Sequence, residues 1–205
     1  MYIVIGLGNP EEQYKMTRHN TGRIILELLA KKHKFSAWKE DIKMKALISK
    51  GEIDGEKFMF FLPNNFMNNS GKSVAPLFNS LLKTNTVLAR KMLLEKLVVV
   101  YDDMDLPMDS LKISFNRSSG GHNGLESIIK SLKSQEFSRI RVGISPATSK
   151  GLAKKPNGED KVVNFLLKNF KQQELDQLKK ISKRVELALV TLSAQGRLKA
   201  MSICN

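Results

Sequence analysis

The sequence predicts an α/β fold, because short apolar runs typical of strands alternate with stretches of helical periodicity. The clearest strand is KLVVVYDD (96–103), in which four consecutive apolar residues lead into acids, as in a buried central strand. The clearest helix begins at about Gln172, where apolar residues up to Leu192 recur at helical spacing. The chain of 205 residues shows neither an internal repeat nor a linker. We therefore expect residues 1–205 to form one domain.

The other elements follow from similar local patterns along the chain. The first strand, YIVIG (2–6), is bounded by glycines and a proline, and the helix RIILELLAKKHK (23–34) has lysines in its last turns, where they complement the helix dipole. Further strands are predicted at KMKALISK (43–50), KFMFFLP (57–63), LKISF (111–115) and RIRVGIS (139–145), and further helices at SVAPLFNSLL (73–82) and GLESIIKSLKS (124–134). The segment 146–160 contains Pro, Gly and Lys without apolar periodicity, which predicts a mobile loop.

The chain carries a large excess of positive charge, with 34 Lys and Arg against 20 Asp and Glu and a formal net charge of +14. Such a surplus attracts polyanions and favours nucleic acid as a partner, although a basic proteome or a need for solubility would also produce it. No apolar segment is long enough to span a bilayer, so we expect a soluble cytoplasmic protein without a membrane partner. The single cysteine, Cys204, excludes an internal disulfide and a cysteine zinc cluster.

Two of the three histidines are followed by asparagine, in TRHNTG at His19 and in SSGGHNG at His122. His19 is the best candidate for a general base, because neutral imidazole accepts a proton near neutral pH. Asp102, at the end of the central strand, is a candidate to orient His19 and to stabilise its imidazolium form. A lone histidine is more often structural or solvated, and His33 in the lysine-rich KKHKF is expected to be solvated. No GxSxG motif or reactive cysteine offers a rival nucleophile, so a hydrolysis here would use water directly.

The loop GLGNP after the first strand begins like a dinucleotide-binding loop but lacks its third glycine. Glu11 and Glu12 stand where a pyrophosphate would approach, and their charge opposes its binding. A Rossmann-type oxidoreductase is therefore disfavoured. Asn9 in this loop is either a turn residue or a hydrogen-bond donor to substrate.

Two further stretches admit both a structural and a chemical interpretation. The acids of DDMDLP (102–107) either bind a hard metal ion or cap the end of their strand, and they guarantee fewer oxygen ligands than such an ion prefers. In FMNNSG, Phe66 and Met67 are expected to be exposed, and Asn68 either contacts a ligand or caps the helix that follows. Neither stretch alone decides between a binding site and a helix or strand end.

Five motif blocks resemble, in order and spacing, those of bacterial peptidyl-tRNA hydrolase: IVIGLGNPEEQYKMTRHNTG, FMNNSGKSV, DDMDLP, SSGGHNGLESI and FSRIRVGIS. The resemblance runs from Tyr2 to about Phe170. It implies a single α/β domain with a twisted mixed β-sheet surrounded by helices. It also implies hydrolysis of the ester between a peptide and the tRNA 3′ end, which recycles tRNA from peptidyl-tRNA released prematurely by stalled ribosomes. The family uses no metal and no cofactor, and on family grounds we expect a monomer.

By matching position, the resemblance places the catalytic roles on His19 and its partner Asp102. It places the substrate-holding asparagines at Asn9, Asn68 and Asn123, with Tyr14, Phe66, Met67 and His122 lining the cleft. Amides suit this work because each offers a donor and an acceptor, and so can hold peptide backbone and ribose without recognising a side chain. The expected partner is therefore peptidyl-tRNA, bound through its acceptor stem and 3′ end.

The phosphate clamp departs most from the family pattern, which pairs an arginine with a lysine on the tRNA 5′-phosphate. Arg141 matches the arginine, whereas Ser114 stands at the lysine position, with Lys112 and Arg117 close by as substitutes. Asp109 replaces a glycine of the family, and aspartate tolerates left-handed conformations better than most residues. The resemblance thus implies tRNA binding at Arg141 with an altered second cation.

An alternative is a relative that binds RNA without catalysis, as a member of this superfamily does in intron splicing in plant organelles. Such relatives can keep the site residues, so the presence of His19 and Asp102 does not exclude this function. Release of free peptide from peptidyl-tRNA would distinguish the two.

Overall fold

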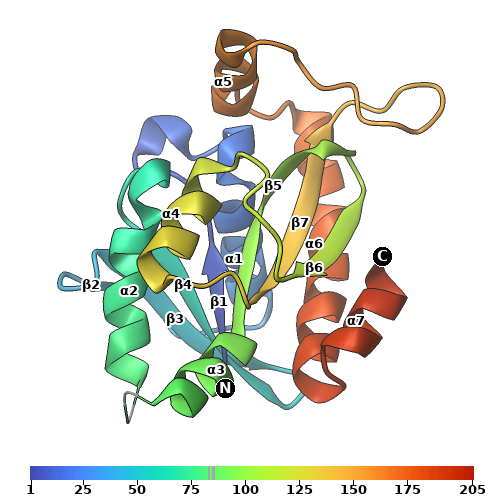
Figure 1. Ribbon diagram of the computed structural model, residues 1–205. Helices are drawn as coiled ribbons and strands as arrows, with labels where there is room; N and C mark the ends of the chain where they lie inside the picture. Colours follow the sequence, from blue (N-terminus) through green and yellow to red (C-terminus); the bar gives the residue numbers. More distant parts are fainter. Residues whose placement is uncertain (83, 85) are drawn as a thin grey trace.

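The structure, a computed structural model, describes residues 1–82, 84 and 86–205. Its centre is a seven-stranded sheet in the order β2-β3-β4-β1-β5-β7-β6 (Figure 1). The strands are β1 (Tyr2–Gly6), β2 (Lys39–Asp41), β3 (Ala46–Ile53), β4 (Glu56–Pro63), β5 (Leu97–Pro107), β6 (Leu111–Phe115) and β7 (Ser138–Ser145). The sheet is mixed, because β4, β1, β5 and β7 are parallel whereas β2, β3 and β6 run antiparallel to their neighbours.

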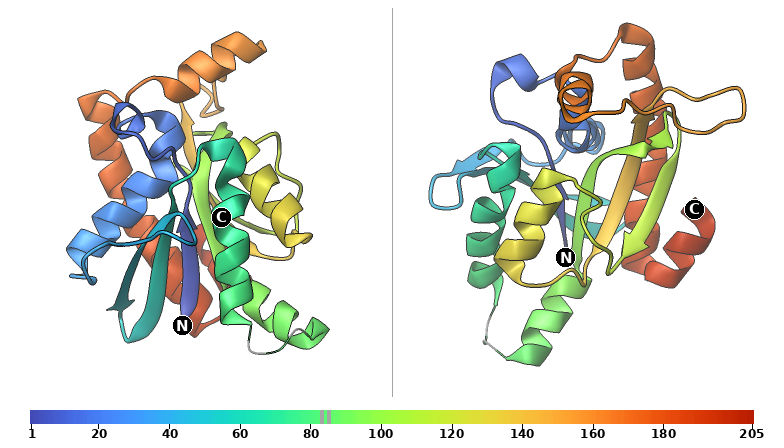
Figure 2. Two further views of the ribbon diagram at one scale, coloured as in Figure 1. Left: turned by 90° about the vertical axis from the view of Figure 1, so that its left-hand side faces the viewer. Right: turned by 45° about the horizontal axis from the view of Figure 1, so that its top comes forward.

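Helices cover both faces of this sheet (Figure 1 and Figure 2). In the described part of the chain they are α1 (Thr21–Lys32), α2 (Ser70–Leu81), α3 (Val87–Glu95), α4 (Asn123–Leu132), α5 (Glu159–Leu167), α6 (Gln172–Ala194) and α7 (Arg197–Cys204), with the short 3₁₀ turns η1 (Glu12–Tyr14), η2 (Arg18–Asn20) and η3 (Met67–Asn69). One buried apolar layer joins the sheet to α1, α6 and α7, and the other joins it to α2, α3 and α4. This confirms the predicted α/β class with a mixed sheet surrounded by helices.

The strand β5 shows how the sequence determines the two layers. Val98 and Val100 belong to the buried cluster on the side of α1 and α6, whereas Val99 and Tyr101 belong to the cluster under α2 and α4. Alternation with a period of two residues is what a strand buried on both faces requires. Asp102 comes next in β5, just past Val100, where the pairing with β1 ends. It therefore lies beside the carboxyl end of the parallel strand β1, which is where α/β sheets place functional side chains.

The start of α1 lies against the sheet because Gly22 has no side chain. A Cβ atom at Gly22 would lie only 2.1 Å from the backbone oxygen of Val100 and 2.6 Å from the backbone nitrogen of Leu7. No other residue type therefore fits without displacing the helix from β5. His19, which precedes α1 by two residues, is brought in this way to Asp102 on β5.

Most elements agree with their sequence patterns, including α6, which begins at Gln172 as predicted. One strand, β2, and three α-helices, α3, α5 and α7, were not predicted, nor were the short 3₁₀ turns. The helix α5 begins at Glu159, inside the segment 146–160 that was expected to be a loop. The mobility of the remainder of that segment stays a prediction. Asp109 has a φ of 74°, in line with its expected tolerance of the left-handed region.

The expectation that His33 is solvated is wrong. Its side chain is only 18% exposed, and its Nε2 atom lies 3.2 Å from a carboxylate oxygen of Glu186 on α6. The cause is the packing of α1 against α6, which covers the last turn of α1 and which the lysine-rich local sequence does not reveal. In the described residues, no helix is both long and apolar enough to cross a membrane.

Candidate active site

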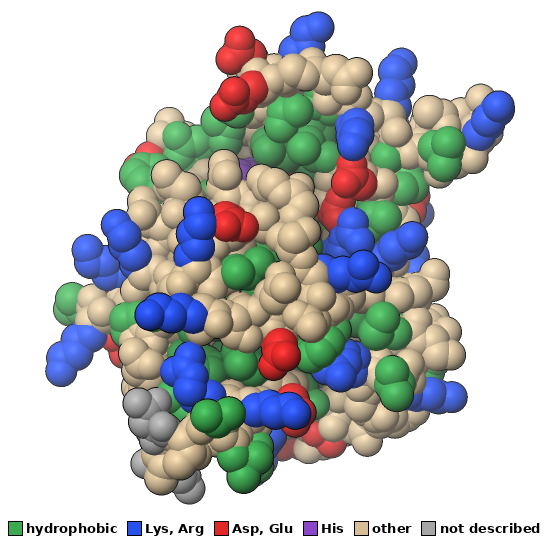
Figure 3. Space-filling model, viewed as in Figure 1, with side chains coloured by type: hydrophobic (Ala, Val, Ile, Leu, Met, Phe, Trp, Pro, Cys, Tyr) green, Lys and Arg blue, Asp and Glu red, His purple; other side chains and the backbone are tan. Residues whose placement is uncertain are grey.

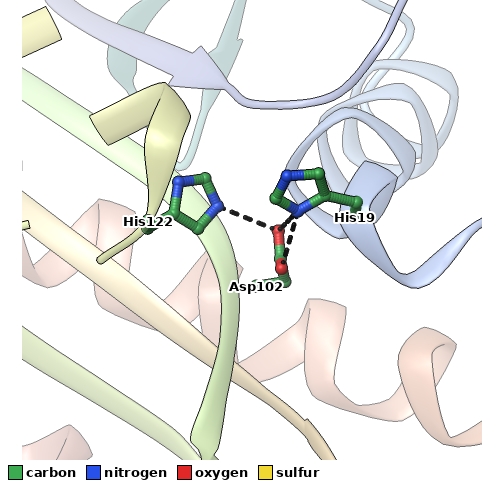
Figure 4. Close-up of side chains that lie close together, drawn as sticks. All are labelled: His19, Asp102 and His122. Carbon is green, nitrogen blue, oxygen red and sulfur yellow. Dashed lines mark hydrogen bonds and ion pairs between the residues drawn. The ribbon is translucent and has the colours of Figure 1, made fainter. Parts of the chain in front are cut away.

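The centre of the site is a carboxylate held between two histidines (Figure 4). The Nδ1 atom of His19 lies 3.0 and 3.1 Å from the two carboxylate oxygens of Asp102. The Nε2 atom of His122 lies 3.2 Å from Asp102 Oδ1, from the opposite side. The three residues come from η2, from β5 and from the position just before α4, so three distant parts of the sequence meet here.

The hydrogen bonds fix which ring nitrogens carry protons. The Nδ1 atom of His122 accepts the backbone N–H of Leu125 at 3.2 Å and so caps the first turn of α4. Its proton must then reside on Nε2, which donates to Asp102. His19 donates to the same carboxylate through Nδ1–H, because a carboxylate only accepts. The Nε2 atom of neutral His19 therefore keeps a free lone pair, as a general base requires.

The protons assigned to His19 Nδ1 and His122 Nε2 also decide whether these residues can bind a metal ion. Nitrogen and oxygen atoms of His19, Asp102 and His122 lie within 4.8 Å of one another, a spacing that could surround a metal ion. The nitrogens that face Asp102 carry protons, however, and a protonated nitrogen has no lone pair to offer. His122 would also have to give up its cap on α4 to bind through Nε2 as a neutral ligand. This donor set favours a hydrogen-bonded triad over a metal site.

Burial and charge act in opposite directions on the titration of this pair. Burial alone would lower the pKa of His19, but the charge and hydrogen bond of Asp102 outweigh it and raise the pKa above its ordinary value. Burial alone would raise the pKa of Asp102, yet His19 and His122 hold it well below its usual range. Asp102 thus stays ionised, and His19 becomes a free base only above its raised pKa.

Asn9 is held with its amide group in a defined orientation. Its backbone N–H donates to Asn20 Oδ1 at 2.8 Å, and its backbone oxygen accepts from Asn20 Nδ2 at 2.9 Å. Its side-chain oxygen accepts the backbone N–H of Met67 at 2.8 Å. With the oxygen occupied in this way, the two N–H groups of the Asn9 amide remain available as donors. Asn20, which is buried and follows His19, is a supporting residue that the sequence patterns did not identify.

A cavity of about 430 Å³ opens beside His19. It is lined by Asn9, His19, Phe66, Met67, Asn68, Asn69, Asn123, Val163, Leu166 and Leu167. One wall is therefore rich in amides, and the other is apolar. In the space-filling view, hydrophobic side chains gather below α5, with a histidine visible beside them (Figure 3).

The cavity brings together most of the residues expected to hold substrate. Asn68 and Asn123 are exposed at its wall, and Phe66 is 49% exposed, as expected. The expectation that Met67 is exposed is wrong, since it is 5% exposed and packs over Gly124, which leaves room for its sulfur. Only tertiary packing of η3 on α4 explains this burial, so the local sequence could not reveal it.

Three other expected site residues lie outside the cavity lining. Tyr14 is partly buried in η1. His122 contacts Asp102 through its Nε2 atom. Arg141 lies on β7, where its Nε donates to Asp103 and its side chain is 29% exposed. None of these three side chains lines the cavity, although the His122 ring centre lies 5.0 Å from that of His19.

The sequence patterns did not predict the apolar wall of the cavity, because it belongs to the unpredicted helix α5. The run VVNFLL (162–167) comes one residue after the acids Glu159 and Asp160, which are typical of a helix start, and its apolar residues could have been the signal. No residue of α5 is buried, so the helix lacks the buried stripe on which such predictions depend.

Comparisons with known proteins agree with this geometry. The family model described as Peptidyl-tRNA hydrolase matches residues 3–205. A protein named peptidyl-tRNA hydrolase from Solibacter usitatus (strain Ellin6076) is 36% identical over 205 residues, covering 100% of this chain and 94% of the relative. One from Thermoanaerobacter sp. (strain X514) is 35% identical over 100% of both chains. The crystal structure of peptidyl-tRNA hydrolase from Acinetobacter baumannii matches with a TM-score of 0.81 and 26% identity, covering 100% of this chain and 94% of that one.

We predict that the His19 imidazole titrates above its ordinary value of 6.5 in the native chain. In Asp102→Asn the charge is lost while burial remains, so the pKa of His19 should fall below that value. A proton NMR titration of the histidine rings measures both, with Asp105→Asn, an exposed carboxylate on the same strand, as the control. A His19 pKa that stays raised in Asp102→Asn would contradict the assignment.

Proposed function

The chain belongs to the peptidyl-tRNA hydrolase family, which cleaves the ester between a peptide and tRNA, and we propose that it does so with His19 as general base and Asp102 as the orienting partner. One observation carries this proposal. The two carboxylate contacts of His19 Nδ1 leave Nε2 as the free nitrogen of a side chain that lines the cavity. A water molecule held there would face both a base and the amide donors of the wall.

In the proposed reaction, His19 Nε2 takes a proton from water while the water oxygen attacks the ester carbonyl carbon. The resulting tetrahedral intermediate carries a negatively charged oxygen. Its collapse breaks the bond to the ribose 3′-oxygen, which receives the proton from the His19 imidazolium. The products are a peptide with a free carboxyl group and a tRNA with a free 3′-hydroxyl. Asp102 holds the imidazole in one tautomer throughout and stabilises its charged form.

Asn9 is the strongest candidate for the donor that stabilises the negatively charged oxygen. The bond from the Met67 N–H to its amide oxygen fixes the orientation of the amide, and both N–H groups stay available to donate to the substrate. Asn20 fixes its backbone on both sides, which keeps this donor in place before substrate arrives. A preorganised donor of this kind typically contributes about 3 kcal/mol to catalysis.

Peptide and ribose are proposed to lie against the remaining amides. Asn68 and Asn123 are exposed at the cavity wall, and each can both donate and accept. Phe66 and Met67 supply apolar contacts beside them. Tyr14, in η1, is proposed as a substrate contact outside the cavity. Because amides recognise backbone and hydroxyl groups, the site would accept many peptide sequences.

The acceptor stem of the tRNA is proposed to bind near β6 and β7. Lys112 is exposed on β6 and lies directly opposite Arg141 in the register with β7. Ser114 lies opposite the fully buried Arg139, and its hydroxyl is also buried, so position 114 is poorly placed to contact a phosphate. Lys112 is therefore the better candidate for the second cation of a 5′-phosphate site.

We also propose the setting in which the enzyme acts. As a peptidyl-tRNA hydrolase it would recycle tRNA from peptidyl-tRNA released prematurely by stalled ribosomes. We propose that it acts in the cytoplasm as a monomer, without a metal or a cofactor. The hydrogen-bonded arrangement of His19, Asp102 and His122 supports metal-free chemistry, because it already uses the lone pairs and protons of the triad.

Replacing the base should remove hydrolysis but not the fold. We expect His19→Ala to lower kcat by roughly 10²–10⁴-fold, because general base catalysis is lost, while circular dichroism stays native. Release of labelled peptide from an N-acetyl-aminoacyl-tRNA measures the rate. Near-normal hydrolysis by His19→Ala would remove the base assignment, and RNA binding without any hydrolysis by the wild type would favour the non-catalytic relative.

Asn9→Asp tests the proposed donor with an almost unchanged side-chain shape. The carboxylate can still accept from Met67 N–H but cannot donate, so we expect kcat to fall roughly 100-fold with little change in KM. Asn79→Asp, an exposed position of α2, controls for the added charge. If Asn9→Asp raised KM and left kcat unchanged, Asn9 would bind substrate without stabilising the negatively charged oxygen.

The 5′-phosphate site predicts a difference between two substrates. We expect a roughly tenfold higher kcat/KM for peptidyl-tRNA with its 5′-phosphate than for the same substrate after phosphatase treatment. Lys112→Met should narrow this ratio, whereas Lys91→Met, at an exposed position on α3, should not. Equal rates of the wild type on both substrates would count against the site.

A further inference from the structure

Arg18, the residue before His19, is an unusually buried cation, with only 5% of its surface exposed. Its Nη2 atom donates to both carboxylate oxygens of Glu174, at 2.8 and 2.9 Å. Its Nη1 atom lies 3.3 Å from the backbone oxygen of Lys168 and 3.5 Å from that of Phe165. A single guanidinium thereby connects the turn that holds His19 to the end of α5 and to the first turn of α6.

Backbone hydrogen bonds also join the segment around Arg18 to the segment that links α5 and α6. The Arg18 N–H donates to the oxygen of Lys168 at 3.2 Å, and the Phe170 N–H donates to the oxygen of Met16 at 2.9 Å. Between them, Thr17 pairs with Asn169 as an antiparallel bridge. The segments 16–18 and 168–170 are thus joined as two short strands would be, directly beside His19.

Aromatic rings complete the enclosure of the cation. The Cζ atom of Arg18 lies 4.7 Å from the ring centre of Phe165 and 5.5 Å from that of Phe170. Both distances are within the range of cation–π attraction. Arginine suits such a position because its planar group bonds at its edge and stacks on its face at the same time, which lysine cannot do.

The helix α5 depends on this attachment more than a typical helix would. It has no buried residue, and it stands away from the body of the sheet (Figure 2). Among the described elements, it packs most closely against η2, which contains Arg18. Nevertheless it supplies Val163, Leu166 and Leu167 to the wall of the cavity. Phe165 and Leu166 of α5 are only partly buried against the main core, so the contacts of Arg18 at the C-terminal end of the helix contribute much to its position.

We propose that Arg18, together with Glu174, is a positioning residue that holds α5 as the apolar wall of the cavity. The inference rests on the proposed function, because it assigns this wall to the binding of peptidyl-tRNA. Loss of the attachment removes contacts made equally before and during the reaction, so it raises KM and leaves kcat nearly unchanged. His19 keeps its Asp102 partner, which does not touch Arg18 in this arrangement.

The test uses Glu174→Gln in the full chain. Glutamine keeps the shape and can still accept the Lys171 N–H that starts α6, but it removes the charge that holds Arg18. Arg18→Lys is the second variant, since it keeps the positive charge but loses the planar guanidinium group that bonds Glu174 and the backbone oxygens at the same time. The matched control is Asp176→Asn, which removes an exposed ion pair with Lys179 from the same helix. Kinetics on an N-acetyl-aminoacyl-tRNA are combined with hydrogen exchange of the α5 amides.

We expect Glu174→Gln and Arg18→Lys to raise KM about fivefold or more with kcat within about twofold, and to speed exchange in α5, while the control behaves as wild type. A role in stability alone would lower the melting temperature but leave KM and α5 exchange unchanged at a temperature where the variants are folded. That result would overturn the inference while wild-type hydrolysis stood. A wild type that hydrolyses nothing would instead remove the proposed function, and with it the inference.

Discussion

The site depends on one buried carboxylate. Asp102 is 3% exposed and ionised, so it requires donors, and both come from histidines that are distant in sequence. His19 and His122 can reach it only if the start of α1 and the start of α4 both lie close to Asp102 on β5. Gly22 allows the first approach, and the cap that His122 places on α4 fixes the second. The need of buried Asp102 for two histidine donors therefore constrains both the packing of α1 and α4 and the geometry of the active site.

The two histidine–asparagine pairs of the sequence have divided roles around this carboxylate. In the first pair, His19 faces the cavity, while Asn20 is turned inward and holds the backbone of Asn9. In the second pair, His122 is turned inward toward Asp102, while Asn123 faces the cavity. Each pair therefore presents one residue to substrate and uses the other as support. A repeated dipeptide with opposite orientations would be difficult to recognise without the structure.

Sequence patterns predicted the elements whose burial is periodic, such as the strand at 96–103 and the helix from about Gln172. They also predicted the pairing of His19 with Asp102, because both residues follow from element ends and from the family resemblance. Sequence patterns did not predict the position or burial of residues that depend on contacts with distant parts of the sequence. The helix α5 has no buried stripe, and the burial of Met67 and His33 comes from α4 and α6. Supporting contacts of this kind leave no local pattern.

The steady-state kinetics of Asp102→Asn test the central claim most directly. Asparagine has the same shape but one acceptor oxygen for two histidine donors, and it cannot stabilise an imidazolium. If Asp102 orients His19, kcat on an N-acetyl-aminoacyl-tRNA falls by roughly 10²-fold or more while KM stays within about twofold. An unchanged kcat with a raised KM would mean that Asp102 contacts substrate and that His19 works without it.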